Sequence, residues 1–244
     1  MQERKNVIEV KGLWKKFGNF AANKGLTFSV KKGEIFGFLG ANGAGKTTTI
    51  KILCGLWKPT SGKVTVSGFD VYTQPDKIKK NIGYMSQKFS LYEDLTPVEN
   101  IRFYGGIYGL SKDEIRRRTD EAMKTLALES VAKRPVKDLP LGWKQKLAFT
   151  VAMVHRPGIV FLDEPTGGVD PLARRQFWNM IYEASNSGVT IFVTTHYMDE
   201  AEYCNRISIM VEGEIKALDT PANLKSRFGV NTINDVFLKL ARST

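Results

Sequence analysis

Long apolar runs, internal repeats and low-complexity segments are all absent from this sequence. No stretch approaches the ~18–20 consecutive apolar residues that a membrane-spanning helix needs. The first six residues carry charge and no apolar segment follows them, so we expect no secretory signal there. Only two cysteines occur, Cys54 and Cys204, both in sequence of intracellular type, which predicts reduced thiols.

Basic residues, by contrast, are plentiful. The chain has 36 Lys and Arg against 25 Asp and Glu, a formal net charge of +11. This excess favours an anionic partner, either acidic lipid headgroups or nucleic acid, and charge alone does not choose between them. Apolar residues make up 42% of the chain, as in ordinary globular proteins. A chain of 244 residues can form one large domain or a core with an inserted subdomain.

The most specific pattern is Gly-Ala-Asn-Gly-Ala-Gly-Lys-Thr-Thr at residues 40–48, between an apolar run at 35–39 and a helical pattern at 49–53. Glycines let successive backbone N–H groups turn toward a phosphate, and a helix N-terminus adds about 0.3–1 kcal/mol of anion stabilisation. The lysine supplies a charge to the β- and γ-phosphates, and the threonine hydroxyl can ligate Mg²⁺. We therefore predict a nucleoside triphosphate site formed by Gly40, Asn42, Gly43, Ala44, Gly45, Lys46, Thr47 and Thr48.

A second group of polar residues follows buried strands. Asp163 and Glu164 end the apolar run 159–162, which places two carboxylates in the crevice where open α/β sheets bind ligands. Asp163 can hold Mg²⁺ directly or through water, and Glu164 can deprotonate an attacking water, an effect typically worth 10²–10⁴-fold. His196 follows the strand pattern at 189–194, where it is either a structural hydrogen-bonding group or a contact to the terminal phosphate.

Local patterns also predict the architecture. Residues 7–10, 26–30 and 63–66 alternate apolar and polar side chains, which predicts an antiparallel sheet beside the glycine loop. Capping boxes at 96–99 and 111–114 begin helices, and a third helix is expected from about Pro140, at its first position, to His155. His155 is expected to bind helix carbonyls and is given no chemistry. These helices form an inserted subdomain or part of a continuous α/β wrap, since both would show the same local signals.

Beyond residue 155, strands at 159–162 and 189–194, a helix from residue 170, a helical segment at 199–203 and a hairpin over 207–218 complete the pattern. We predict an α/β fold: a P-loop NTPase core with a mostly parallel sheet, an N-terminal antiparallel β subdomain and an inserted α-helical subdomain. The chain is expected to be a single domain, 1–244. Its parts are the core with the β subdomain (1–95 and 156–225), the helical subdomain (96–155) and a C-terminal tail (226–244).

Six motifs stand in one order along nearly the whole chain: residues 40–47, Gln87, the segment 139–145, the pair Asp163-Glu164, the segment 167–170, and His196. In this order they resemble the nucleotide-binding subunit of an ATP-binding cassette (ABC) transporter, with Walker A, Q-loop, signature, Walker B, D-loop and switch histidine. The tail at 233–238 is similar to that of cassettes serving multidrug-type or polysaccharide-type export permeases, which favours export.

The resemblance implies an ATPase in which two cassettes close around two ATP molecules. The signature segment of one, including Gly142, then caps the γ-phosphate held by the other, and Asp170 of the D-loop is also an implied nucleotide-binding residue. Glu164, His196 and Gln87 are the implied catalytic residues, and Thr47, Gln87 and Asp163 the implied Mg²⁺ site. Phe17 is expected to stack on adenine, worth ~1–3 kcal/mol, with Phe20 as the competing candidate and core packing as the alternative for both.

The chain departs from the family pattern in two segments. Pro140 and Leu141 stand where the family signature usually has serine and glycine, and Gly167 stands where its D-loop often has serine. Proline has neither a hydroxyl nor an N–H, so one charge-assisted hydrogen bond worth about 1.5–3 kcal/mol is absent. We expect an active ATPase, with asymmetric pairing to a cassette of fuller signature as the alternative to a symmetric pair.

The implied partners are integral membrane permease subunits, contacted by residues 89–92, and a second ABC ATPase subunit, identical or different. The implied location is the cytoplasmic face of the cell membrane, and no nucleic acid is expected. Two alternatives stay open. One is a soluble cassette acting on ribosomes or nucleic acid, and the other is a regulatory cassette that does not hydrolyse ATP.

Overall fold

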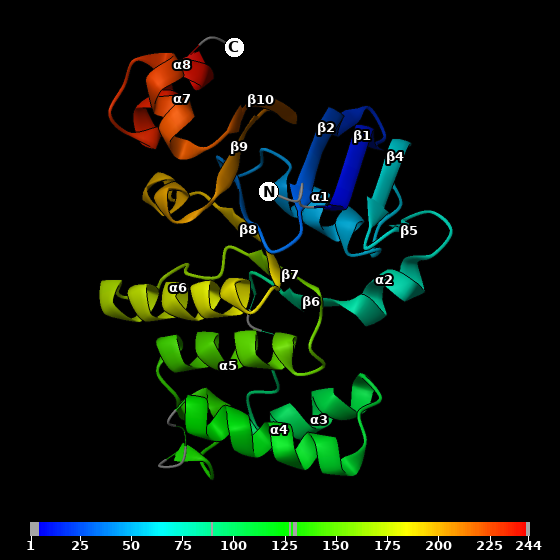
Figure 1. The fold of residues 1–244 in the computed structure, drawn as a ribbon, viewed down its shortest axis with the longest axis vertical. Coiled ribbons are helices and arrows are strands. Elements are labelled where there is room, and N and C mark those ends of the chain that lie inside the picture. Colours follow the sequence, from blue (N-terminus) through cyan, green and yellow to red (C-terminus); the bar gives the residue numbers. More distant parts are fainter. Residues whose placement is uncertain (1–4, 89, 127, 129–130, 243–244) are drawn as a thin grey trace.

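The computed structural model describes residues 5–88, 90–126, 128 and 131–242. Phe89, expected to face a permease, lies outside these ranges. The strands form two sheets (Figure 1). The antiparallel sheet A runs in the order β2 (Phe20–Lys31), β1 (Asn6–Phe17), β4 (Ser61–Val66) and β5 (Phe69–Asp70). Sheet B runs in the order β10 (Glu214–Asp219), β9 (Arg206–Val211), β3 (Ile35–Gly40), β8 (Thr190–Thr195), β7 (Ile159–Asp163) and β6 (Ile82–Met85).

Sheet B is parallel except for β10, which pairs with β9 as the expected hairpin. The helices are α1 (Lys46–Leu53), α2 (Pro75–Asn81), α3 (Pro97–Ile107), α4 (Lys112–Thr125), α5 (Leu141–Met153), α6 (Pro171–Asn186), α7 (Pro221–Phe228) and α8 (Ile233–Arg242). Among the described residues, the 3₁₀ segment η2 (Val136–Asp138) lies between α4 and α5, and η3 (Met198–Tyr203) lies between β8 and β9. The predicted fold class is confirmed: a mostly parallel core sheet, an antiparallel β subdomain and helices.

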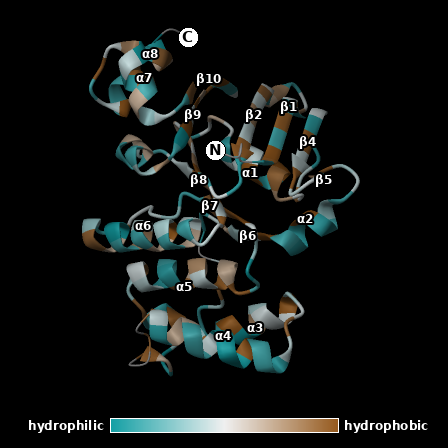
Figure 2. Ribbon diagram, in the orientation of Figure 1, coloured by the Kyte–Doolittle hydropathy of each residue, from teal (hydrophilic) through white to brown (hydrophobic). Residues whose placement is uncertain are grey.

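The central strands of sheet B are apolar on both faces because each face has its own core. Phe36 and Phe38 of β3 pack in the cluster shared with sheet A and α1, whereas Ile35 and Leu39 pack in the cluster shared with α5 and α6. Period-two alternation directs neighbouring side chains to opposite faces, so a strand buried on both sides loses its polar positions. Figure 2 shows the resulting brown residues along the strands, with teal residues on the outer helices.

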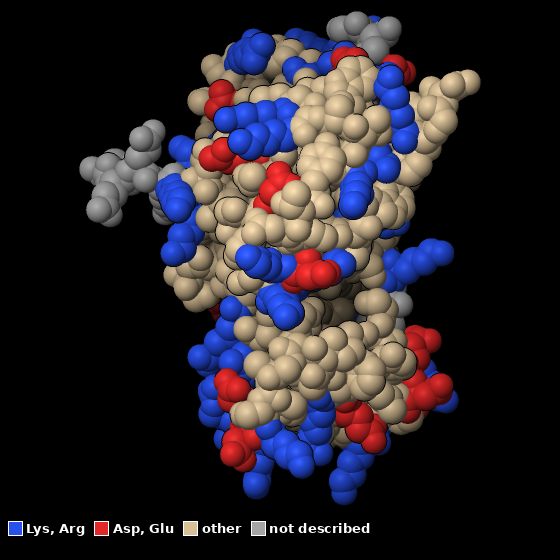
Figure 3. Space-filling model, turned by 90° about the vertical axis from the view of Figure 1, so that its right-hand side faces the viewer, with Lys and Arg blue, Asp and Glu red and all other residues tan. Residues whose placement is uncertain are grey.

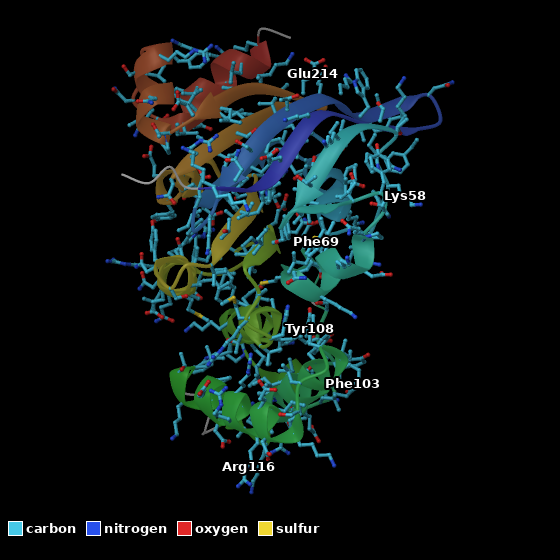
Figure 4. All side chains as sticks on the ribbon, turned by 45° about the vertical axis from the view of Figure 1, so that its right-hand side comes forward. Lys58, Phe69, Phe103, Tyr108, Arg116 and Glu214 are labelled. Carbon is cyan, nitrogen blue, oxygen red and sulfur yellow. The ribbon has the colours of Figure 1, made fainter. Side chains whose placement is uncertain are left out.

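The segment between β6 and β7 forms a helical unit at one end of the molecule. Both predicted capping boxes are present: the Thr96 hydroxyl accepts from the Glu99 N–H and the Glu99 carboxylate accepts from the Thr96 N–H, and Ser111 and Glu114 repeat the exchange. Phe103 on α3 and Arg116 on α4 mark this unit in Figure 4, at the opposite end from Glu214 of β10. Local sequence signals are therefore sufficient to begin these two helices.

Several local expectations needed correction. Helix α5 begins at Leu141, and Pro140 occupies the N-cap position with φ −56° and ψ 149°, so our placement of proline at the first helical position was wrong. His155 does not bind the carbonyls of the helix that it follows: its Nε2 lies 3.0 Å from the carbonyl oxygen of Ile82, the C-cap residue of α2, and its ring stacks on Tyr108 at 3.6 Å. The helices α2, α7 and α8 were not expected from sequence at all.

Two global expectations can be compared directly with the fold. Cys54 and Cys204 are free, as predicted; both are also buried, and burial raises the pKa of both thiols. Among the helices of the described residues, none has the length and apolar character needed to cross a bilayer. Figure 3 shows Lys and Arg side chains spread over one face rather than gathered in one stripe.

Candidate nucleotide site

The glycine loop joins the end of β3 to the start of α1, and neighbouring backbone determines where glycine is required. A Cβ on Gly45, which has φ 102°, would lie 2.3 Å from the Ala22 carbonyl oxygen of β2. A Cβ on Gly40 would lie 2.5 Å from the Met210 carbonyl oxygen of β9. Gly45 is also the N-cap of α1 and offers no side-chain cap, so the first N–H groups of α1 are left to an external acceptor such as phosphate.

A pocket of about 410 Å³ opens beside this loop. That volume lies within the range of small-molecule sites. Its walls come from the β1–β2 hairpin, the glycine loop with α1, and the segments after β6 and β7. The lining residues are Phe17, Phe20, Ala22, Asn42, Gly43, Gly45, Lys46, Thr47, Thr48, Gln87 and Glu164.

Most residues predicted to hold nucleotide therefore line one pocket, and two loop residues contribute differently. The Gly40 carbonyl oxygen accepts a hydrogen bond from the Lys46 ammonium, 2.8 Å away. The Ala44 side chain is buried in the core shared with sheet A, which leaves only its backbone for the loop.

Lys46 is 4% exposed, and its ammonium lies among three oxygens. It donates to the Gly40 and Ala41 carbonyls at 2.8 and 3.1 Å, and it lies 3.3 Å from the Glu164 carboxylate. A buried ammonium needs such partners because burying an unpaired charge is costly. Phosphate oxygens can accept the same hydrogen bonds from the Lys46 ammonium and carry more negative charge, so a triphosphate can replace these contacts.

Glu164 is the centre of the site. Its carboxylate meets the Lys46 ammonium, accepts a hydrogen bond from the Gln87 amide at 2.9 Å and lies 3.0 Å from Nδ1 of His196. Three residues that lie far apart in sequence thus converge on one carboxylate. Glu164 also has φ 50°, a backbone conformation that costs a non-glycine residue of order 1–3 kcal/mol and that is concentrated at functional sites.

Asp163 lies one residue earlier, at the end of β7, and is 1% exposed. Its Oδ1 accepts from the Thr194 hydroxyl at 2.7 Å and from the Thr47 hydroxyl at 3.3 Å. Burial raises the pKa of Asp163, the hydrogen bonds from Thr194 and Thr47 oppose that rise, the Glu164 charge adds to it and the Lys46 charge opposes it. The buried carboxylate is therefore only partly compensated by its surroundings.

The donor set fits Mg²⁺, which prefers oxygen ligands and usually takes one or two from protein and the rest from phosphate and water. The Asp163 carboxylate and the Thr47 hydroxyl meet beside the pocket. Within the described ranges, no three His, Cys, Asp or Glu side chains group into a metal site. A Mg²⁺ ion held by Asp163 and Thr47 would take its remaining ligands from the nucleotide and from water. The Gln87 side chain, the third predicted ligand, is bonded to Glu164 and not to Asp163 or Thr47.

Gly142 and Asp170 do not line this pocket. Asp170 is the N-cap of α6, where its carboxylate accepts from the Leu172 and Ala173 N–H groups at 3.0 and 2.9 Å. A Cβ on Gly142 would lie 2.8 Å from the Ala173 Cβ, so Gly142 lets α5 approach α6 closely. Within one chain, both residues serve helix packing and capping.

Two residues that sequence analysis missed hold the site together. Asn23 is fully buried on β2 and donates to the Thr49 hydroxyl and the Gly45 carbonyl, which ties sheet A to the glycine loop. Thr194 bonds both Asp163 and the Glu164 N–H. A buried polar residue inside an apolar strand was the available signal for Thr194, and no local signal marked Asn23.

Comparisons with known proteins agree with this geometry. Residues 23–167, more than half of the chain, match a family model described as ABC transporter. The chain is 50% identical over 221 residues to "Probable multidrug ABC transporter ATP-binding protein YbhF" of Escherichia coli (strain K12), a match that covers 91% of this chain but 38% of that protein. This chain therefore spans well under half the length of that relative.

Two further similarities cover larger shares. The chain is 37% identical to "Linearmycin resistance ATP-binding protein LnrL" of Bacillus subtilis (strain 168), over 97% of this chain and 79% of that protein. Among solved structures, a dimeric ATP-binding cassette in a post-hydrolysis state, bound to ADP and Pi, superposes with a TM-score of 0.78 at 27% identity. That match covers 87% of this chain and 98% of the other.

Proposed function

This chain belongs to the ABC transporter family, and we propose that it binds ATP at the pocket beside α1 and hydrolyses it to power transport through a separate membrane permease. The convergence of Lys46, Gln87 and His196 on Glu164 carries the proposal. A phosphate-binding loop alone would support binding, whereas a carboxylate held by these three groups beside the loop supports hydrolysis.

Binding begins with an exchange of partners. The Lys46 ammonium leaves Glu164 for the β- and γ-phosphate oxygens, and the N–H groups at the start of α1 receive the remaining phosphate charge. This exchange frees the Glu164 carboxylate, which then faces the terminal phosphate without its ammonium partner. Nucleotide binding itself therefore prepares the base.

Hydrolysis needs one proton transfer. Glu164 takes a proton from water as the water oxygen attacks the γ-phosphorus and the bond to the β-phosphate oxygen breaks, which leaves ADP and phosphate. Gln87 and His196, already in contact with the Glu164 carboxylate, fix its orientation. Mg²⁺ held by Thr47 and Asp163 would neutralise charge that develops on the phosphate oxygens.

A second cassette would complete the site. The N-terminus of α5 has no side-chain cap, and Leu141, its first residue, is 41% exposed. This helix end can therefore approach a phosphate presented by another chain. We place Gly142 in that dimer contact, as the resemblance implies, and Asp170 among the residues that bind nucleotide. The post-hydrolysis relative is described as dimeric and bound to ADP and Pi, which supports this arrangement.

Export and a peripheral position at the cytoplasmic membrane face are parts of the same proposal. The multidrug and antibiotic-resistance names of the two relatives support export. The helical unit exposes apolar side chains to a partner: Tyr92 is 50% exposed, Phe103 42% and Ile107 63%. We expect the permease to cover this surface, and no nucleic acid to bind.

The proposal is tested by measuring nucleotide binding and phosphate release in the Lys46→Ala variant. Loss of the Lys46 ammonium is expected to abolish both, because the residues described as lining the pocket then offer phosphate no positive charge. Lys80→Ala, at an exposed lysine of α2 outside the pocket lining, is the control and is expected to retain both. Turnover that is unchanged in Lys46→Ala would refute the assignment of the pocket.

A further inference from the structure

The aromatic residue at the edge of the pocket does not stand alone. Phe17 ends β1 and is 44% exposed, and Trp57, which follows α1, packs against it edge to face with 5.4 Å between ring centres and an interplanar angle of 74°. Trp57 does not itself line the pocket. An exposed ring that must present one orientation to a ligand binds more tightly when a neighbour restricts its motion.

Lysines extend this contact on both sides. The Lys51 ammonium lies 4.4 Å from the centre of the Trp57 ring, and the Lys15 ammonium lies 4.9 Å from the centre of the Phe17 ring. Each pair is within cation–π distance. The four side chains form a column, Lys51–Trp57–Phe17–Lys15, in which every ring has a fixed neighbour; we call it the aromatic column.

Backbone contacts hold the two halves of the aromatic column in register. The loop that carries Trp57 bonds to β1, the strand that carries Phe17, at three points. The Lys15 ammonium donates to the Lys58 carbonyl, the Thr60 N–H donates to the Trp14 carbonyl and the Thr60 hydroxyl accepts from the Lys16 N–H. Lys58 lies beside sheet A in Figure 4. The spacing of the two rings is therefore set by main chain as well as by stacking.

Phe20 provides the contrast. It also lines the pocket and is 64% exposed, yet it has no ring partner within the described part of the chain. A free ring loses rotamer freedom when a base stacks on it, whereas a ring already held by a neighbour has lost part of that freedom beforehand. The difference favours Phe17 over Phe20 as the surface that a base contacts.

We infer that Trp57 is a positioning residue for the nucleotide base: it fixes the Phe17 ring without touching the nucleotide. The inference rests on the proposed function, because it concerns the same pocket. It predicts an effect confined to ligands that carry a base. The phosphate-binding groups lie on the glycine loop and α1, and none of them belongs to the aromatic column.

The test compares ATP with inorganic tripolyphosphate, which has the phosphates but no base. Trp57→Ala is expected to weaken ATP binding by roughly 2–10-fold, the range of one aromatic pair, and to leave tripolyphosphate binding unchanged. Trp57→Phe should restore ATP affinity. Trp14→Phe is the matched control, since Trp14 is equally exposed at 37% and also has a lysine over its ring, 5.4 Å away.

Tryptophan emission gives a readout that general loss of structure would not mimic. Adding ATP to the wild-type chain is expected to change the emission of Trp57, because a base that covers the Phe17 ring changes the surroundings of the Trp57 ring packed against it, whereas tripolyphosphate leaves both rings uncovered. Trp57→Phe should lose this change while keeping its affinity, which also covers the case of a Trp57→Ala chain that does not fold.

The outcomes separate the two claims. Failure of the wild-type chain to bind ATP would overturn the proposed function. ATP binding by wild type with the same affinity in Trp57→Ala would overturn only the role of Trp57. An equal loss of ATP and tripolyphosphate affinity in Trp57→Ala would overturn it as well, because Trp57 would then act on the loop as a whole.

Discussion

At the glycine loop the polar groups are buried and bonded to one another, whereas at the start of α5 the helix end is uncapped and faces outward. Lys46 is 4% exposed and has three oxygen partners. Pro140, by contrast, gives α5 no side-chain cap, and Leu141 is 41% exposed. Both helices begin without a side-chain cap, but at the glycine loop the charged side chains of the site are complete within this chain, whereas the start of α5 presents only an open helix end. This is the arrangement expected when a second chain supplies the missing half.

The largest expected effect tests the complete region. Glu164→Gln should retain ATP binding, lower phosphate release by about 10²–10⁴-fold and accumulate a nucleotide-bound dimer, because an amide cannot take the proton from water. Steady-state phosphate release, ATP binding and size-exclusion chromatography with ATP measure these three quantities.

Glu212→Gln is the control for that experiment. Glu212 shares the unusual positive φ, at 49°, but is exposed and outside the pocket lining. Its turnover should match wild type. A monomeric Glu164→Gln chain that hydrolyses ATP freely would contradict the role of base and remove the contrast between the two regions.

The second prediction repairs the incomplete region. Pro140→Ser restores a hydroxyl at the N-cap of α5, which should stabilise the helix by about 1 kcal/mol and, if the chain pairs with itself, raise turnover by up to roughly 10–150-fold. Pro135→Ser is the matched control, because Pro135 precedes η2 with nearly the same backbone angles, φ −57° and ψ 144°. A higher melting temperature without faster turnover would mean that this helix end does not meet ATP in a pair of identical chains.

The third prediction asks whether Gly142 serves packing within its own chain. Gly142→Ala should cost about 1–3 kcal/mol of unfolding free energy, since its Cβ would lie 2.8 Å from the Ala173 Cβ. Gly106→Ala on α3 should instead be neutral or stabilising by up to about 1 kcal/mol, because nothing lies within 4 Å of the added atom. Equal stability changes in the two variants, measured by urea denaturation, would show that α5 does not need this close approach.

Sequence predicted the parts of the site that local chemistry specifies. Glycine spacing, a lysine before a helix and two carboxylates after an apolar strand each carry their meaning within a few residues, as at Lys46 and Glu164. The approach of Gln87 and His196 to Glu164 depends instead on β6, β7 and β8 being neighbours in sheet B, and strand order is not a local property. Only the resemblance to a family supplied it.

Other parts of the fold had no usable local signal. The helices α2 and α7 have seven and eight residues, and helices this short are stabilised by packing rather than by propensity. Asn23 and Trp57 lie in segments for which the sequence made no prediction, and their importance comes from the residues that the fold places beside them. Pro140 was misplaced by one position because proline is over-represented at the first helical residue, whereas here the helix begins one residue later.

The smallest expected effect concerns the free-energy cost of burying the Asp163 carboxylate at the glycine loop when no ligand is bound. Asp163 is buried with a raised pKa, so its charged form is disfavoured in the folded, nucleotide-free chain. Asp163→Asn should therefore raise the melting temperature of the nucleotide-free chain, by roughly 2–4 °C for each kcal/mol relieved in a chain of this size. Asp76→Asn, at an aspartate whose side chain is 87% exposed, should leave the melting temperature unchanged within error.

The pH dependence gives that prediction its sign. Because the folded pKa of Asp163 lies above the unfolded value of about 3.9, the folded state binds more protons between the two values, and stability falls as pH rises through that window. The advantage of Asp163→Asn should thus grow as pH rises above about 4 and vanish below it. A stability advantage that is independent of pH would mean that burial of the Asp163 charge is not its cause. The nucleotide-free pocket would then accommodate the charged carboxylate at no greater free-energy cost than a neutral amide.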